Sequence, residues 1–92
     1  MKVTWTEQAA DDLESIANHI RKDSAETARR VAKKIFDIIM SLPALLLRGR
    51  KREGDAGREL VLAPWPYIAV YEVVETNLYI KAIRRTSRDW SH

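Results

Sequence analysis

Residues 58–73 read RELVLAPWPYIAVYEV and carry the strongest strand signal in the chain. β-Branched, aromatic and aliphatic residues dominate both ends of the stretch. Pro64 and Pro66 interrupt it, because proline cannot donate a hydrogen bond to a sheet. We therefore predict two strands, 58–62 and 67–74, and we expect Tyr67 and Tyr71 to face the core together with Ala69 and Val73.

A turn at 75–77 leads into LYIKAIRR, residues 78–85, which predicts a third consecutive strand. Strict alternation assigns Leu78, Ile80 and Ala82 to one face of this strand. Tyr79, Lys81 and Ile83 fall on the other. The second half of the chain thus reads as a three-stranded meander.

The first half reads as a short strand and two helices. KVTW at 2–5 is β-prone, and Thr6 is placed to cap a helix over roughly 7–22 whose apolar residues recur every three or four positions. Ser24 is placed to cap a second amphipathic helix that Pro43 ends. The order β-α-α-β-β-β predicts a single α+β domain over residues 1–92, with an N-terminal helical hairpin packed on a small, mostly antiparallel sheet.

Residues 44–57, between the second helix and the meander, show no hydrophobic periodicity and contain three glycines, Gly49, Gly54 and Gly57. Basic residues crowd the same stretch and its end. We therefore expect a mobile, cationic loop here.

Composition bounds the protein class. Ninety-two residues build one modest core, and 46% hydrophobic with 32% charged residues is typical of a folded domain. Neither a signal peptide nor a run of about 18 apolar residues is visible, and cysteine is absent. We expect a cytoplasmic protein that does not enter the membrane.

The net charge of +3 is unevenly distributed. Residues 1–43 carry seven basic and seven acidic groups, whereas 44–92 carry nine basic and six acidic ones. This excess favours an acidic partner, such as nucleic acid or an acidic protein segment. A merely solvated cationic surface is the alternative interpretation.

Missing residue types exclude most catalytic chemistry. With only His19 and His92, neither a histidine metal cluster nor a Ser-His-Asp triad can form, and no phosphate-binding glycine motif occurs. We expect no cofactor. The chemistry that remains is that of arginine, which grips phosphates or stabilises developing negative charge but is a poor general base.

The order of these segments resembles a known family. RELVLAPWPYIAVYEV, a further strand and then RRTSRDW at 84–90 resemble the second half of the RelE/ParE toxins of bacterial and archaeal type II toxin-antitoxin pairs. VTWTEQAADDLESIANHI at 3–20 resembles their first strand and helix. The resemblance implies a toxin that a cognate antitoxin inhibits by wrapping around it.

Two activities are known in this superfamily, and the resemblance leaves both open. RelE-type members cut messenger RNA on the ribosome with basic residues and often a C-terminal tyrosine or histidine. On this chain the matching positions are Arg50, Lys51 and Arg52 in the loop, with Arg84 or Arg85 at the end of the last strand. Ala63-Pro64 and Trp90 replace residues that a ribonuclease of this group tends to use, which disfavours that activity.

ParE-type members poison DNA gyrase without being nucleases. PYIAVYEV and the RDW ending are closer to this type, although Arg85-Thr86 stands where ParE-type sequences more often have His-Gly. The resemblance implies that the residues binding the target are Arg58, Arg84, Arg85, Arg88 and Trp90. Trp90 either stacks on a partner or anchors the end of the chain to the sheet. A member that has lost toxicity and only binds antitoxin is a further alternative.

Overall fold

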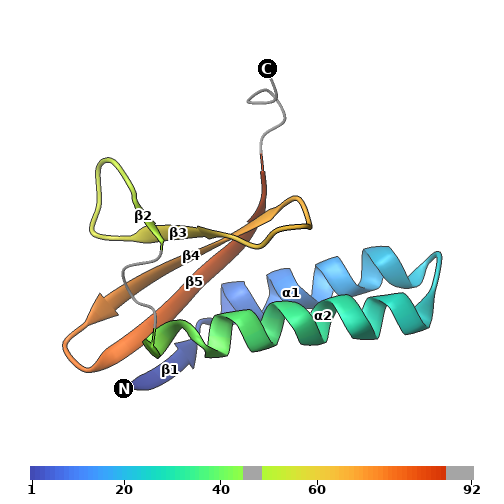
Figure 1. The fold of residues 1–92 in the computed structure, drawn as a ribbon, viewed down its shortest axis with the longest axis horizontal. Coiled ribbons are helices and arrows are strands. Elements are labelled where there is room, and N and C mark those ends of the chain that lie inside the picture. The colour runs from blue at the N-terminus through green and yellow to red at the C-terminus, as the bar shows by residue number, and fades with distance from the viewer. Residues whose placement is uncertain (45–48, 87–92) are drawn as a thin grey trace.

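The structure is a computed structural model that describes residues 1–44 and 49–86 (Figure 1). Two antiparallel helices lie against one face of a five-stranded sheet. In chain order the elements are β1 (Lys2–Trp5), α1 (Glu7–Arg21), α2 (Ala25–Met40), the short 3-10 helix η1 (Leu42–Ala44), β2 (Arg50–Lys51), β3 (Arg58–Val61), β4 (Tyr67–Val74) and β5 (Asn77–Arg85). The predicted α+β class and the β-α-α-β-β-β order are confirmed, and β2 is an additional strand.

Both helices begin where the sequence predicts. The Thr6 hydroxyl accepts a hydrogen bond from the backbone N–H of Ala9 at 3.1 Å, and the Ser24 hydroxyl accepts one from Thr27 at the same distance. Each cap satisfies an N–H group that has no partner inside the helix. α2 ends at Met40, and Pro43 lies in the 3-10 turn that follows.

The sheet has the strand order β1-β5-β4-β3-β2. β1 pairs with β5 in parallel, and every other neighbouring pair is antiparallel. The helical hairpin between β1 and the meander brings the first and last strands side by side, as Figure 1 shows. The predicted mostly antiparallel sheet is confirmed.

β2 corrects the expectation that residues 44–57 form only a loop. Arg50 pairs with Glu59, and Lys51 pairs with Arg58, so the cationic segment forms a short hairpin with β3. The turn contains Gly54, whose φ of 91° lies in the left-handed region that glycine adopts at little cost.

A β-bulge in β5 corrects a second expectation. Tyr71 of β4 pairs with Ile80, but the preceding Val70 pairs with Ala82, so Lys81 is one extra residue on β5. Because side chains alternate between the two faces, one inserted residue exchanges the faces of everything that follows it.

Strict alternation assigned Ile83 to the face opposite Leu78 and Ile80. The bulge instead turns Ile83 into the core, where it is 5% exposed, and moves Ala82 to the other face. The assignment of Leu78 and Ile80 to one face holds, because both precede the bulge.

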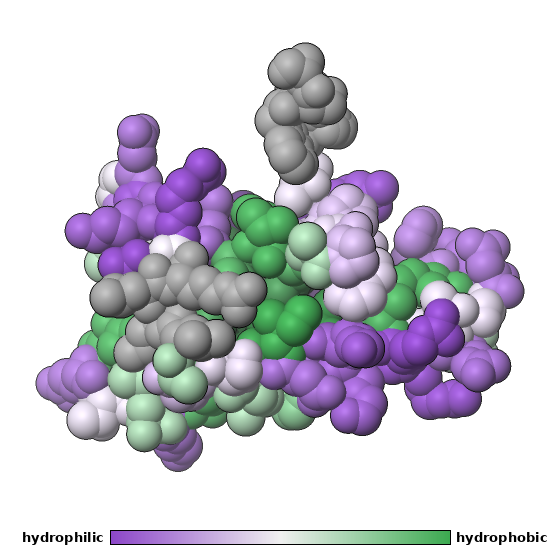
Figure 2. Space-filling model, viewed as in Figure 1, coloured by the Kyte–Doolittle hydropathy of each residue, from purple (hydrophilic) through white to green (hydrophobic). Residues whose placement is uncertain are grey.

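The hydrophobic core lies between the sheet and the helices. Its buried side chains come from every layer, namely Ala9, Ile16, Val31, Ile35, Ile39, Leu42, Leu60, Leu62, Tyr67, Ala69, Tyr71, Leu78, Ile80 and Ile83. The predicted burial of Tyr67, Ala69 and Tyr71 is confirmed. The expectation for Val73 is wrong, since this residue, next to the end of β4, is 39% exposed. Figure 2 shows hydrophobic residues along the seam between sheet and helices, with hydrophilic ones over the β2–β3 hairpin. Within the described residues, no helix has the length and apolar character needed to cross a membrane.

Candidate functional site

The end of β5 presents two of the predicted target-binding residues. Arg84 and Arg85 are its last two residues, and both are exposed. Just beyond them, the N–H of Thr86 donates a 2.9 Å hydrogen bond to the carbonyl of Pro66, in the segment between β3 and β4. The backbone that carries both arginines is therefore tied to the sheet up to Thr86.

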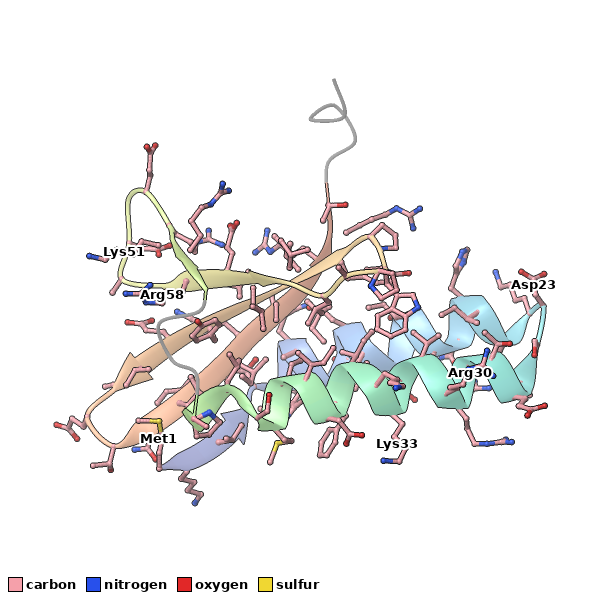
Figure 3. All side chains as sticks on the ribbon, in the orientation of Figure 1. Met1, Asp23, Arg30, Lys33, Lys51 and Arg58 are labelled. Carbon is pink, nitrogen blue, oxygen red and sulfur yellow. The ribbon has the colours of Figure 1, made fainter. Side chains whose placement is uncertain are left out.

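The β2–β3 hairpin holds the second group of predicted cations. Arg50 and Lys51 are exposed, and Figure 3 shows Lys51 at the end of the molecule opposite the tip of the helical hairpin, where Asp23 lies. Arg52 is different, because its side chain is only 26% exposed and contacts two carboxylates, those of Asp55 and Glu59, both at 3.2 Å.

Arg58 is engaged with the backbone of its own hairpin. Its guanidinium donates a 2.8 Å hydrogen bond to the carbonyl of Gly49, and the side chain is half-buried. The Gly49 N–H in turn donates to the hydroxyl of Tyr71 at 3.0 Å. Arg58 thus holds the start of β2 in place, which is a structural role that the sequence did not indicate.

A groove of about 550 Å³ joins the hairpin to the end of β5. Its lining includes the buried Val70 and Ala82, which pair with each other on the face of the sheet opposite the core. The full lining is Gln8, Asp12, Arg52, Asp55, Gly57, Val70, Glu72, Lys81, Ala82, Ile83 and Arg84. Of the predicted cations the groove brings together Arg52 and Arg84, whereas Lys51, Arg58 and Arg85 are not part of its lining.

Most cations of the groove are paired with carboxylates from the same chain. Lys81 contacts Glu72 at 3.1 Å across the β4–β5 pair, and Arg52 contacts Asp55. Arg84 forms no ion pair within residues 1–44 and 49–86. Cations neutralised in this way attract a polyanion less strongly than the sequence count suggests, because each paired charge is partly cancelled at close range.

Asp55 shows how tightly the hairpin turn is organised. Its carboxylate accepts a 2.7 Å hydrogen bond from the N–H of Gly57 and pairs with Arg52. The Gly57 N–H first, and then the positive charge of Arg52, lower the pKa of Asp55 below its ordinary value of 3.8. The Asp55 carboxyl therefore stays ionised to a lower pH than an ordinary aspartate does.

Two predicted residues, Arg88 and Trp90, lie outside the described residues. The structure accordingly places Arg50, Lys51, Arg52, Arg58, Arg84 and Arg85 of the predicted set. They lie on a cationic hairpin and at a cationic strand end, and one residue from each, Arg52 and Arg84, lines the groove.

Comparison with known proteins identifies the family. The model of the ParE toxin of type II toxin-antitoxin systems, parDE, matches residues 3–90. The chain belongs to this family. The predicted membership of the RelE/ParE superfamily, on its ParE side, is confirmed.

Individual relatives agree with the ParE assignment. The Sinorhizobium fredii protein Y4kP, whose given name places it among toxins, is 30% identical over 89 residues, which cover 97% of this chain and 92% of that protein. A structure of the chromosomal ParDE toxin-antitoxin system from P. aeruginosa is similar with a TM-score of 0.84 and 29% identity, covering 95% of this chain and 97% of that one. The YoeB/ParE toxin from Agrobacterium tumefaciens shares the fold, with a TM-score of 0.67 and 22% identity over 95% of this chain and 100% of that one.

On this ParE-family chain, sequence reasoning missed the acidic members of the site. Asp12, Glu59 and Glu72 come from three different elements and contact the backbone or the cations of the site. Alternation places Glu59 and Glu72 on the strand face opposite the core, which is the available signal for them. No local pattern marks Asp12, because its partner Ile83 is 71 residues away.

Proposed function

We propose that this ParE-family toxin arrests growth by poisoning DNA gyrase and that a cognate antitoxin neutralises it. The observation that carries the proposal is the match of nearly the whole chain to the ParE toxin model, together with 29% identity to a component of a ParDE system. Action on gyrase requires a cytoplasmic location.

The charges of the groove support the same conclusion. A ribonuclease that relies on cations needs them free to face a phosphodiester and the charge that develops on it. Of the cations that line the groove, Arg52 and Lys81 are paired with carboxylates inside the chain. Arg84 is the one lining cation without an ion pair in the described residues, and a single free cation favours a protein target over messenger RNA.

Within this proposal, Arg84 and Arg85 contact the target, together with Arg88 and Trp90 further along the chain, and Arg58 supports them from the hairpin. Exposed guanidinium groups form paired hydrogen bonds with carboxylates of a partner protein. The same exposed cations attract acidic groups of an antitoxin, which would cover them.

The test is inhibition of DNA supercoiling by purified gyrase, titrated with this protein in the presence and absence of its antitoxin. We expect inhibition that the antitoxin relieves. Gyrase that runs unaffected beside a protein that still arrests growth would contradict the proposal, and cleaved transcripts would then indicate the RelE-type activity. Antitoxin binding without any arrest of growth would indicate a binding module.

The residues are tested in the same assay with charge-matched variants. R84A/R85A/R88A, or truncation after Ile83, should abolish inhibition. R29A/R30A/K34A removes three exposed cations from α2 and should leave inhibition unchanged. Equal loss in both triple variants would mean that overall charge, and not the end of β5, is responsible.

A further inference from the structure

The end of β5 extends past the strand that covers its outer side. β1 pairs with β5 only from Asn77 to Ile80. Thr6 then closes this ladder, since its N–H and its hydroxyl both donate to the carbonyl of Ile80, at 3.1 and 2.9 Å. From Lys81 onward, no described strand lies on that side of β5.

A side chain from α1 takes the place of the missing strand. Oδ2 of Asp12 accepts a 2.9 Å hydrogen bond from the backbone N–H of Ile83. Oδ1 of the same carboxylate accepts a 2.7 Å hydrogen bond from Nε2 of Gln8, one helical turn earlier. Hydrogen bonds to an ionised carboxylate are short and strong, so this contact is a firm tie between the helix and the strand.

This tie lies next to the residues that the proposed function uses. Ile83 directly precedes Arg84, and on the far side of the two arginines the Thr86 N–H is held by Pro66. The backbone of Arg84 and Arg85 is thus fixed at both ends, by α1 before it and by the β3–β4 connection after it. A side chain presented from a fixed backbone loses less conformational entropy on binding.

Asp12 and Arg84 also line the same groove. The carboxylate of Asp12 is occupied by a backbone N–H and an amide, and in the described part of the chain it forms no ion pair with Arg84. The carboxylate of Asp12 is therefore occupied by these two hydrogen bonds, and the guanidinium of Arg84 stays available to a partner.

We propose that Asp12 is a positioning residue of the toxin: it holds the bulged end of β5 so that Arg84 and Arg85 face the target in one orientation. The proposal rests on the proposed function only in the statement that Arg84 contacts the target. It does not depend on which target that is.

The hydrogen bond from Ile83 to Asp12 determines which variants test the proposal. D12A removes the acceptor, whereas D12N keeps an amide oxygen that can still accept from Ile83. D11A is the matched control, because Asp11 is the neighbouring carboxylate, is exposed, and makes the same change in net charge. Thermal unfolding of all three, followed by circular dichroism, identifies the temperature range in which each variant is folded.

The first readout is amide hydrogen exchange at Ile83. Loss of the acceptor should make this amide exchange faster by about tenfold or more in D12A, since local opening no longer breaks a hydrogen bond. D12N should stay within about threefold of the wild type, and D11A should be unchanged. Unaltered exchange in D12A would overturn the proposal.

The second readout is growth arrest on induction, which does not depend on gyrase being the target. D12A should raise the amount of toxin needed by about tenfold, and D11A should not. In an R84A background the added effect of D12A should be smaller than in the wild type, because the part that acts through Arg84 is already lost and coupled residues do not act additively. Equal toxicity of D12A and D11A, or additive effects of D12A and R84A, would overturn the proposal. Failure of the gyrase assay alone would count only against the proposed function.

Discussion

The hydroxyl of Tyr71 accepts a hydrogen bond from the backbone N–H of Gly49 at 3.0 Å, across 22 residues of sequence. The carbonyl of Gly49 accepts a second one from Arg58 at 2.8 Å. Tyr71 is fully buried, so one end of the cationic hairpin is anchored in the hydrophobic core. Gly49 therefore links the hydrophobic core to the cationic β2–β3 hairpin.

Tyr71→Phe should lower the free energy of unfolding by about 1–3 kcal/mol, because it leaves the buried N–H of Gly49 without an acceptor. Urea denaturation measures the change. Tyr79→Phe is the matched control, since the Tyr79 hydroxyl has no hydrogen-bond partner among the described residues. A similar loss in both variants would show that the hydroxyl of Tyr71 is not the cause.

Gly49→Ala should destabilise the fold by about 1–3 kcal/mol through overpacking. A Cβ at this position would lie 2.3 Å from the Tyr71 hydroxyl oxygen and 2.8 Å from a ring carbon, and the ring is fully buried. Thermal melting gives the loss. Gly57→Ala should cost less, because its Cβ meets nothing nearer than 3.1 Å. A G49A variant as stable as the wild type would contradict this prediction.

Thr6→Ala should cost more stability than Ser24→Ala. Each substitution removes a helix cap worth about 1 kcal/mol. The Thr6 hydroxyl also donates to the carbonyl of Ile80 at 2.9 Å and so joins β1, α1 and β5, whereas the Ser24 hydroxyl bonds only within the helix that it caps. Equal losses in chemical denaturation would mean that the contact with β5 adds nothing to stability.

Acid should remove a contribution that Asp55 makes to stability. Its pKa is lowered in the folded state by the Gly57 N–H and then by Arg52, so the folded state binds the proton less readily than the unfolded state. The contribution is fully present above the ordinary pKa of 3.8 and is lost as pH falls through the lowered value. Melting temperatures of the wild type and D55A should therefore converge below pH 3.8. A constant difference across that range would exclude this linkage.

Local patterns predicted most of the elements. The apolar spacing of the helices, their Thr6 and Ser24 caps and the strand composition each depend on residues within about four positions of one another. These patterns can be read from the sequence because the contacts that stabilise each element form between residues that are close together in the chain.

The site was predictable only in part. The exposed cations could be named, because arginine and lysine stay in contact with water wherever the chain places them. Their partners could not be, since Glu59, Glu72 and Asp12 reach them or their backbone only after folding. The pairing that neutralises Arg52 and Lys81 is therefore a tertiary result.

The sequence by itself determined the fold class, the two helix starts, the core tyrosines and the family. Only the tertiary structure decided that Lys81 is bulged, that Ile83 turns inward, and that Asp12 holds the strand end bearing Arg84. The physical reason is how far apart in the sequence the interacting residues lie. Periodicity and capping act between near neighbours, whereas strand register and a contact between residues 71 apart exist only once the whole chain has closed on its core.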